Sequence, residues 1–409
     1  MTDPRSFVDI AERSANPYNN TVARDPVPFY DALRAGCPVA TMSGIEGTHI
    51  ISRYEDVKFA LQHPEIFSSN VAAVDIGQDR PLIPLQIDPP EHSKYRKVMD
   101  PHLAMRHMTP LEGGVRALVT RLIDEFIERG ECDAHAEFTV PIPSTVFLEL
   151  CNLGDERLED FLRWKDDIIR PQVGRPELAW DAEAQSAIRR ETAREIYDFF
   201  GEVIAERHAN PGDDVISRFA QGEVDGERMS DDEMLDVCFL FILGGLDTVT
   251  STLDCSLAYL AQHPERRDRI VEDPSLIPSA IEELLRLHTP VMQILRVVAQ
   301  PHEMHGIQMN PGDHVVVMIG AADTDPDEFG ELAHDLHLDR DVNRHLAFGG
   351  GPHRCLGSNL ARFELKIALE EWHRRIPDYK VAEGALLNYS PGIREIEHLP
   401  FTFTSGERS

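Results

Sequence analysis

The most reactive pattern in this sequence is a glycine-rich loop that carries one cysteine. Residues 348–357 read Phe-Gly-Gly-Gly-Pro-His-Arg-Cys-Leu-Gly, and an amphipathic helical pattern follows from Ser358. At the start of a helix, backbone N–H groups and the positive end of the helix dipole favour thiolate over thiol. Cys355 is therefore predicted to be a soft metal ligand. The alternative is a buried, inert thiol, the usual state of an isolated cysteine.

A long apolar helix is the second feature. Ser230, with Glu233 three residues later, predicts a capping box and so a helix start. Apolar residues then continue on nearly all faces until His263 and Pro264 stop the pattern. Such a helix is expected in the middle of the molecule.

The centre of this helix carries a candidate site for acid–base chemistry. Gly244 and Gly245 each cost about 0.5–1 kcal/mol relative to alanine inside a helix, which indicates that the space beside them is needed. A buried carboxylate is also unfavourable unless it has a partner, so Asp247 and Thr248 beside this gap form a coherent site. The alternative is a packing kink with a capped aspartate.

The elements that must position these residues are mostly helical. Apolar residues at three- and four-residue spacing predict helices at 114–129, 190–207 and 360–375, and β-branched or alternating runs predict strands at 49–52, 291–299 and 314–318. No repeat or low-complexity linker divides the chain. We therefore expect a mainly α protein with small β sheets (α+β), folded as one large domain over 1–409, with β-rich parts near 40–60 and 291–320.

Composition excludes several classes of function. The 409 residues include 40 Lys+Arg and 71 Asp+Glu, a formal net charge of −31, and 42% are hydrophobic. This apolar content suits a folded core, and the acidic charge argues against nucleic-acid and membrane-surface binding. The six cysteines show no C-x-x-C spacing, and the longest apolar run, 237–243, is far shorter than the roughly 20 residues of a membrane span. A cytoplasmic protein is expected.

The cysteine loop identifies a family. The pattern Phe348-x-x-Gly351-x-x-x-Cys355-x-Gly357 resembles the haem-ligand loop of the cytochrome P-450 superfamily at every fixed position. Gly244-Gly245-x-Asp247-Thr248 is similar to the oxygen-activation segment of this superfamily, and residues 243–249 resemble its bacterial camphor hydroxylase branch in particular. Glu283-x-x-Arg286 resembles its helix K signature, and Arg340 resembles the arginine that completes that ion-pair network. The resemblance spans essentially the whole chain and implies one domain around a buried haem.

The resemblance also implies a role for each matching residue. Cys355 would be the proximal thiolate of haem b (iron protoporphyrin IX), whose electron donation favours cleavage of the O–O bond of the co-substrate O2. Thr248 would hydrogen-bond to the oxygen, and Asp247 would bring protons from solvent. Glu283, Arg286 and Arg340 would brace the cysteine loop from behind and have no catalytic role. The remaining haem contacts would be Phe348 and Gly357 in the loop and four propionate donors: His92, Arg96, Arg296 and His353.

Two of these donors have another reading. His92 and Arg96, four residues apart, would lie on one face of a helix, and alone they would be read as a solvated helix pair. Within the full pattern the propionate role is preferred.

Electrons are expected from separate proteins. The sequence has neither a glycine-rich dinucleotide fingerprint nor cluster-ligating cysteines, so we expect no fused reductase. The resemblance implies an iron–sulfur ferredoxin and its flavoprotein reductase, with NAD(P)H used only indirectly, and we expect the enzyme itself to be a monomer. Against the acidic background, a local surplus of basic residues would steer an acidic ferredoxin, unless these are ordinary surface charges: Lys94, Arg96, Lys97, Arg106, His107, Arg344, Arg354 and Arg362.

The expected substrate is a small hydrophobic molecule. The resemblance makes residues 68–87 a lid over the haem, and aliphatic residues would line the cavity: Leu82, Leu85, Leu240, Leu243, Gly244, Val291 and Ile294. A dry apolar cavity favours a terpenoid-like or alicyclic ligand oriented by shape, although these residues could equally be core. Camphor itself is doubtful, because the lid has no tyrosine to bind its ketone. Arg80 could pair with the carboxylate of a fatty acid or steroid acid, or could simply be solvated.

The leading hypothesis is a haem-thiolate monooxygenase that inserts one oxygen atom into an unactivated C–H bond. Steroid or fatty-acid hydroxylation is the first alternative. A non-catalytic haem sensor or carrier is the second, but a sensor has no need of the proton-delivery pair Asp247 and Thr248 beside two glycines.

Overall fold

The five-stranded sheet forms where apolar and polar residues alternate in the sequence or where β-branched residues are frequent. The computed structural model describes residues 20–36, 38–41, 47–70, 76–178, 181–390 and 393–409. Its five-stranded sheet has the order β1-β2-β10-β7-β3. The strands are β1 (Val39–Thr41), β2 (Thr48–Ile51), β10 (His314–Val317), β7 (Ile294–Val298) and β3 (Phe67–Ser68).

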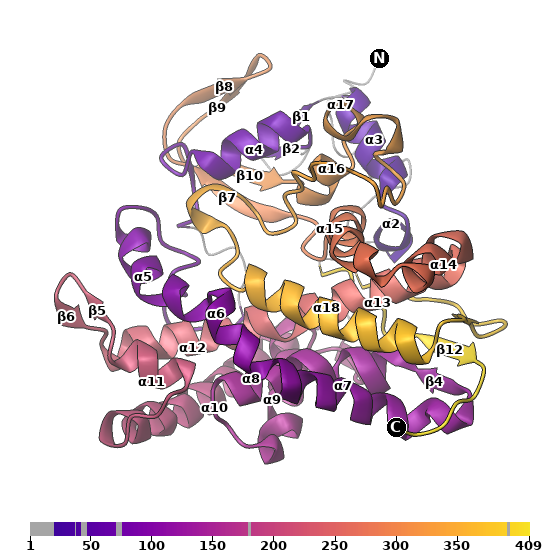
Figure 1. Ribbon diagram of the computed structural model, residues 1–409. Helices are drawn as coiled ribbons and strands as arrows, with labels where there is room; N and C mark the ends of the chain where they lie inside the picture. Colours follow the sequence, from indigo (N-terminus) through magenta and orange to yellow (C-terminus); the bar gives the residue numbers. More distant parts are fainter. Residues whose placement is uncertain (1–19, 37, 42–46, 71–75, 179–180, 391–392) are drawn as a thin grey trace. The chain divides into compact units, whose positions relative to one another are not determined.

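Strand β10 lies between β2 and β7 (Figure 1). It runs parallel to β2, with Val315 opposite His49, and antiparallel to β7, with Val315 opposite Arg296. Val315 and Val317 are fully buried in a core that also contains Val57 and Leu61 of helix α4 (Tyr54–Gln62). The opposite face is also covered, because Ala40 and Ile50 belong to a second apolar cluster with Phe29, Tyr30 and Leu33 of helix α3 (Val27–Gly36).

The described residues fall into two compact units. The first comprises Met1–Ser68, Met108–Ile142 and Thr248–Ser409, and the second comprises Ser69–His107 and Pro143–Asp247. The prediction of one continuous domain over 1–409 stays a prediction.

Helices make up most of the first unit. Helix α7 (Glu112–Phe126) buries Val115, Leu118, Val119, Leu122, Ile123 and Phe126, the spacing of an amphipathic helix. It packs beside α18 (Ser358–Arg375), as Figure 1 shows. The others are α2 (Asn20–Arg24), α3 (Val27–Gly36), α14 (Pro264–Glu272), α15 (Ile277–His288), α16 (Ile319–Asp323), α17 (Pro326–Phe329) and, from Thr248 onwards, α13 (Asp247–Gln262).

The second unit is almost entirely helical. Its helices are α5 (Glu91–Met99), α9 (Leu158–Ile169), α10 (Ala182–Ala209), α11 (Val215–Ala220) and α12 (Asp231–Gly245). Helices α6 (Met105–Met108) and α8 (Pro141–Leu150) cross the limits between the units, and β5 (Glu223–Val224) and β6 (Glu227–Arg228) form a hairpin. Helix α10 packs against α9 and α12.

The predicted elements are confirmed with shifted limits. Helix α10 begins at Ala182, ahead of the predicted 190, because the Asp181 side chain accepts a hydrogen bond from the Ala184 N–H and caps the helix. The predicted strand at 291–299 is shorter, and Val291 forms only an isolated bridge with Ile393. In the region 40–60, strands end at Ile51 and α4 follows.

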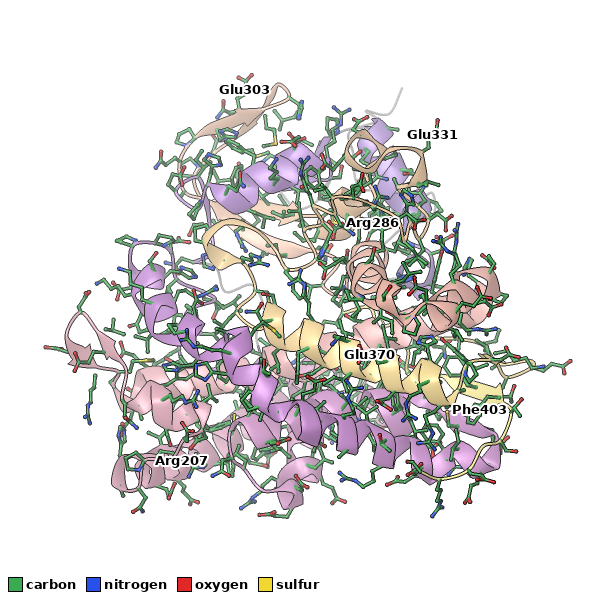
Figure 2. All side chains as sticks on the ribbon, in the orientation of Figure 1. Arg207, Arg286, Glu303, Glu331, Glu370 and Phe403 are labelled. Atoms are coloured by element: carbon green, nitrogen blue, oxygen red, sulfur yellow. The ribbon has the colours of Figure 1, made fainter. Side chains whose placement is uncertain are left out.

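Two small β structures were not predicted: the sheet that joins β11 (Tyr379–Val381), β12 (Pro400–Phe403) and β4 (Glu131–Asp133), and the hairpin of β5 and β6. The hairpin of β8 (His302–Met304) and β9 (Ile307–Met309) falls within the predicted β-rich part near 291–320. Strands this short show too little alternation to be recognised. Figure 2 shows Glu303 extending from the β8–β9 hairpin and Glu331 on the outside, whereas Arg286 lies inside the unit.

The capping box at the start of the apolar helix is confirmed. Ser230 Oγ accepts from the Glu233 N–H at 3.3 Å, and Glu233 Oε2 accepts from the Ser230 N–H at 2.7 Å. The single predicted helix is wrong in one respect, because it is interrupted at Leu246 and divides into α12 and α13. Within the described part of the chain, only the stretch Asp231–Gln262 is long and apolar enough to cross a membrane, and most of it is buried as in a core helix.

Candidate functional site

The loop before α18 is shaped by two glycines in the left-handed region. Gly349 has φ +68° and Gly351 has φ +61°. A Cβ on Gly351 would lie 2.2 Å from the Leu61 carbonyl oxygen, so the loop presses against the end of α4 at a distance that only glycine allows. This close approach explains why the sequence needs glycine here.

The same loop carries Cys355 near its C-terminal end. The Cys355 N–H donates to the Phe348 carbonyl at 2.8 Å, and α18 begins three residues later at Ser358. Cys355 is exposed, whereas burial raises the pKa of the thiols of Cys132, Cys151, Cys238 and Cys255. The description of an inert thiol therefore fits those four cysteines and does not fit Cys355.

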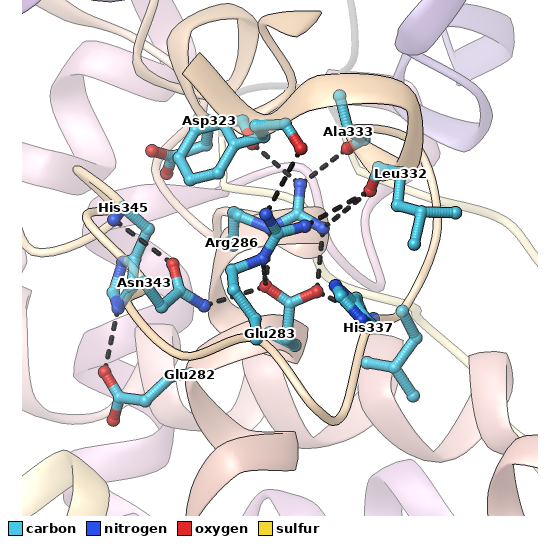
Figure 3. Close-up of polar contacts among 12 residues, drawn as sticks. Glu282, Glu283, Arg286, Asp323, Leu332, Ala333, His337, Asn343 and His345 are labelled. Carbon is cyan, nitrogen blue, oxygen red and sulfur yellow. Dashed lines mark hydrogen bonds and ion pairs between the residues drawn. The ribbon is translucent and has the colours of Figure 1, made fainter.

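A buried ion-pair network forms around Glu283 (Figure 3). Arg286 holds both carboxylate oxygens, with Nε–Oε1 at 2.8 Å and Nη2–Oε2 at 3.0 Å, and Arg340 Nε donates to Oε1 at 2.8 Å. Burial raises the pKa of Glu283, but the hydrogen bonds and charge of Arg286 outweigh it and the net pKa is lowered. The predicted triad of Glu283, Arg286 and Arg340 thus meets as one cluster in the first unit.

This network also orders the chain that leads to the cysteine loop. Arg286 donates to the carbonyls of Asp323 and Asp335 at 3.0 and 2.8 Å, and Asn343 Nδ2 donates to Glu283 Oε1 at 2.9 Å. The Leu346 N–H, two residues before Phe348, donates to Asp323 Oδ1 at 2.5 Å. The position of the loop therefore depends on the network.

Glu282 provides a second connection. Its carboxylate accepts from Arg362 of α18, at 2.6 and 2.8 Å, and contacts His345 Nε2 at 3.0 Å. Burial alone would raise the pKa of Glu282, but the hydrogen bonds from Arg362 and His345 lower it to about 2. The Arg362 guanidinium also lies 4.4 Å from the centre of the Phe348 ring. Glu282, His345 and Arg362 escaped the sequence analysis as a group, because they are far apart in the chain.

The donor set of the loop fits haem. In the described ranges, no group of three or more His, Cys, Asp or Glu side chains could hold a metal ion. A single exposed cysteine at a helix start suits a metal whose other ligands come from a prosthetic group, as the porphyrin nitrogens do. Gly357 leaves the sulfur accessible on its own side, since a Cβ there would meet only Cys355 Sγ, at 4.0 Å.

Asp247 lies in a buried cluster of charge in the second unit. Its side chain is 0% exposed, and Oδ1 lies 3.0 Å from Arg170 Nη2 and 3.2 Å from Lys165 Nζ. Both cations are themselves nearly buried, and Asp166 lies 3.1 Å from the Lys165 ammonium. The carboxylate of Asp247 therefore has the partners that burial requires. Lys165 and Arg170 gave no signal in the sequence that linked them to Asp247.

The surroundings of Asp247 are consistent with the predicted gap. A Cβ on Gly244 would meet no atom within 4 Å, and one on Gly245 would touch Phe147 at 3.4 Å. Thr248, next in the chain, is partly buried in the first turn of α13, and the Thr252 hydroxyl donates to its carbonyl at 2.8 Å. The break at Leu246 thus falls beside the predicted acid–alcohol pair.

The predicted propionate donors fall into two pairs. His92 and Arg96 lie one turn apart on α5; His92 is 2% exposed, and burial, with the nearby Arg96 charge, lowers its pKa to about 4. That burial does not fit a solvated helix pair. In the first unit, Arg296 lies on β7 with its Nη1 2.8 Å from the Leu295 carbonyl, and His353 lies in the short helical turn Gly351–His353.

The predicted wall residues differ in exposure. Leu82 is buried, Leu85 is 45% exposed, Gly244 is exposed, and the others are partly buried: Leu240, Leu243, Val291 and Ile294. Within the proposed lid, residues 71–75 lie outside the described residues.

Arg80 is 37% exposed and pairs with two carboxylates of this chain, and its predicted pairing with a substrate carboxylate stays a prediction. Its Nε lies 3.2 Å from each carboxylate oxygen of Asp236 on α12, and its Nη1 lies 3.2 Å from Asp232 Oδ1. A long-range partner of this kind cannot be recognised in the sequence.

Comparisons with known proteins give the family of this chain. The family model for cytochrome P450 matches residues 39–372. A steroid C26-monooxygenase of Mycobacterium tuberculosis is 34% identical over 394 residues, which are 94% of this chain and 96% of the relative. CYP109Q5 from Chondromyces apiculatus has a TM-score of 0.85 at 29% identity, covering 96% of this chain and 99% of that chain. CYP109E1 from Bacillus megaterium, solved in complex with corticosterone, has a TM-score of 0.84 at 26% identity, covering 94% of this chain and 100% of that chain.

The chain therefore belongs to the cytochrome P450 family. It is a haem b monooxygenase that uses O2 and takes electrons from redox partners. Its mainly helical fold with small sheets is the fold of this family.

Proposed function

We propose that this monooxygenase hydroxylates an aliphatic C–H bond of a steroid-class substrate. The similarity that supports this class is the steroid C26-monooxygenase, which aligns with 94% of the chain. The corticosterone complex of CYP109E1 is in accord with it. The observation that carries the reaction type is the exposed Cys355 held at the start of α18 by the Phe348 carbonyl.

Residues of this chain would hold the haem from several elements. Cys355 would ligate the iron, Phe348 and Gly357 would contact the macrocycle, and His92, Arg96, Arg296 and His353 would donate to the propionates. When bound, the haem supplies thiolate-assisted cleavage of the O–O bond of O2.

Asp247 and Thr248 would deliver the protons that the reaction needs. Arg170 and Lys165 hold the Asp247 carboxylate in place by ion pairs, and this carboxylate would accept a proton from solvent and pass it on. The hydroxyl of Thr248, the residue after Asp247, would donate a hydrogen bond to the co-substrate O2.

The substrate would be held mainly by shape. Arg80 is occupied by Asp236 and Asp232, which favours a neutral ligand over a fatty acid or a steroid acid. The predicted wall is aliphatic, with Leu240, Leu243 and Ile294 among its members. A terpenoid-like or alicyclic ligand is the second candidate on this ground.

We further propose that the redox partners are an iron–sulfur ferredoxin and its flavoprotein reductase, and that the enzyme works as a cytoplasmic monomer. The basic residues of α5 and α6 are the observation that favours a ferredoxin. Some of these side chains, however, already form ion pairs within this chain. Lys94 contacts Asp225 and Glu91 at 2.5 and 3.0 Å, and Arg96 contacts Asp100 at 2.6 Å. Lys97 is exposed, and no ion pair engages it within the described part of the chain.

The test is a titration of the ferric holoenzyme with steroids, terpenoids, fatty acids and simple aromatics, followed at the haem Soret band. A ligand that displaces water from the iron shifts the spin state. A strong high-spin shift with neutral steroids, followed by a hydroxylated product with ferredoxin and reductase, is the expected result. A shift with terpenoids alone would overturn the substrate class and leave the reaction type intact.

A further inference from the structure

A short irregular segment, residues 393–396, lies before β12 in the first unit. Among the described residues it forms two isolated bridges, Ile393 with Val291 and Ile396 with Tyr389. Val291 is one of the predicted wall residues of the substrate cavity, and Val291 and Ile393 are both only partly buried. The position of this segment therefore bears on the shape of the predicted wall.

The backbone of the segment is held by helix α13. The Arg394 carbonyl accepts from the Ser251 hydroxyl at 2.6 Å and from the Cys255 thiol at 3.1 Å. The Arg394 N–H donates to the carbonyl of Pro290, the residue before Val291, at 3.0 Å. Irregular backbone needs such partners, because a buried N–H or carbonyl without a hydrogen bond is unfavourable. The segment is thus fastened to α13 on one side and to the chain beside Val291 on the other.

A buried cluster of two carboxylates and one imidazole includes the next residue of the segment. The side chains of Asp254 and Glu395 are 0% and 2% exposed, and His135 lies between them at 14%. His135 Nδ1 contacts Asp254 Oδ2 at 2.9 Å, and His135 Nε2 contacts Glu395 Oε1 at 3.4 Å. The Thr139 hydroxyl donates to Asp254 Oδ1 at 2.5 Å. His135 and Thr139 are the two ends of one π-helical turn, so this turn joins Glu395 to Asp254 of α13.

The two carboxylates depend on these partners. Burial raises the pKa of Asp254, although the hydrogen bonds from His135 and Thr139 lower it. Arg394 follows another direction, because its guanidinium donates to the carbonyls of residues 23 and 24 at 2.7 and 2.9 Å. The connection from Glu395 to α13 therefore runs through His135. Breaking a buried contact of this kind costs more than breaking an exposed one, because a buried charge loses its compensation.

We propose that Glu395 is a positioning residue for substrate binding, which fixes Ile393 against Val291 through its contact with His135 and Asp254. Glu395 would act through the backbone, since its N–H donates to the Ile393 carbonyl at 2.9 Å. The inference rests on the proposed function in that Val291 belongs to the substrate wall, and it does not depend on the steroid class.

The experiment compares two nitrogen ligands of the ferric holoenzyme, imidazole and 4-phenylimidazole, by titration at the haem Soret band. Both ligate the iron, but only 4-phenylimidazole carries an apolar ring that extends towards a cavity wall. In Glu395→Gln we expect the Kd for 4-phenylimidazole to rise about tenfold, the effect of a small loss of contact in an apolar pocket. The Kd for imidazole should stay native.

His135→Gln should give the same selective loss, and it tests the inference independently if Glu395→Gln does not retain haem. The double variant should bind 4-phenylimidazole no more weakly than either single variant, because both changes break one connection. Glu397→Gln is the matched control, since Glu397 is an exposed carboxylate two residues further along the same stretch of chain. It should bind both ligands with native affinity. Val291→Ala tests the wall itself and should weaken only 4-phenylimidazole.

Native affinity for 4-phenylimidazole in Glu395→Gln and His135→Gln, even with a lowered melting temperature, would overturn the positioning role. An equal loss for imidazole and 4-phenylimidazole would also overturn it, because the effect would then lie at the haem and not at the wall. A selective loss in Glu395→Gln with native affinity in Val291→Ala would support the positioning of Ile393 and contradict the place of Val291 in the wall. A selective loss without any spin shift from steroids would support the positioning role and contradict the proposed substrate class.

Discussion

The Arg170 guanidinium holds the buried carboxylate of Asp247 at 3.0 Å, and Lys165 holds the same oxygen at 3.2 Å. Both cations come from α9 and its end, far from Asp247 in the chain. An ionised carboxylate can be kept in this dry position because two charges compensate it. The Asp247–Arg170 ion pair therefore lies next in the chain to Thr248, the predicted partner of Asp247 in proton delivery.

Replacing Asp247 by asparagine should slow turnover by about 100-fold, within the usual contribution of a positioned acid or base. Haem content and ligand-induced spin shifts should be unchanged, since the amide keeps the volume. Turnover per haem and its solvent isotope effect are the measurements. Native turnover in Asp247→Asn would exclude a role in proton delivery.

Replacing Thr248 by alanine should divert reducing equivalents to peroxide while haem and substrate binding persist. The hydroxyl is lost without a change in the helix, because its neighbour Thr252 bonds to the backbone of residue 248 and not to its side chain. Product and peroxide are counted per NAD(P)H consumed. Unchanged product per NAD(P)H would refute the assignment; Thr252→Ala is the matched control.

Replacing Glu283 by glutamine should destabilise the protein by about 3–5 kcal/mol, the usual cost of breaking a buried ion pair. Arg286 would keep its charge in the core without a counter-charge, and the glutamine amide would offer one acceptor oxygen where the Glu283 carboxylate offers two. We expect reduced haem retention together with a lower melting temperature. Denaturant unfolding and the thiolate Soret signature measure the two effects, and a stable variant with native haem content would contradict the bracing role.

Glu364 on α18 should make stability depend on pH. It is fully buried, its Oε2 has no hydrogen-bond partner within the described residues, and burial raises its pKa from 4.5 to about 8. The folded state therefore favours the protonated acid, so this contribution to stability is full below pH 4.5 and is lost as the pH rises towards 8.

Glu364→Gln should consequently be more stable than the native protein at pH 8, by a few kcal/mol, with the difference vanishing near pH 4.5. Denaturant unfolding at several pH values is the measurement. Glu371→Gln on the same helix is the opposite control: despite burial, its pKa is lowered by Arg116 and Arg374, so its loss should destabilise at neutral pH. A pH-independent difference for Glu364→Gln would contradict the prediction.

Reversing the charge of Lys97 should weaken ferredoxin-supported turnover. Lys97 on α5 is exposed, and no carboxylate pairs with it in the described part of the chain. Lys97→Glu should raise the KM for ferredoxin about tenfold at low salt, with less effect at high salt, because the interaction is electrostatic. Lys380→Glu, an exposed lysine on β11, is the control. Equal KM values for ferredoxin in the two variants would contradict a role of Lys97 in ferredoxin docking. The affinity for the substrate should be native in both variants.

Local chemistry in this protein was readable from the sequence. The loop around Cys355, the capping box of Ser230 and Glu233, and the pairing of Glu283 with Arg286 all involve residues within one loop or one helical turn. Backbone geometry fixes such neighbours, so spacing and residue type are enough to predict them. The family signature at Cys355 rests on the same local information.

Tertiary structure decided the partners that lie far apart in the chain. Arg170 and Lys165 reach Asp247, Arg80 reaches Asp236, and Asp225 neutralises Lys94 only after the helices pack. The break at Leu246 that splits the long helix was likewise invisible in its apolar pattern. Burial selects one partner for each charge from many in this acidic chain, and burial is a property of the folded molecule rather than of sequence spacing.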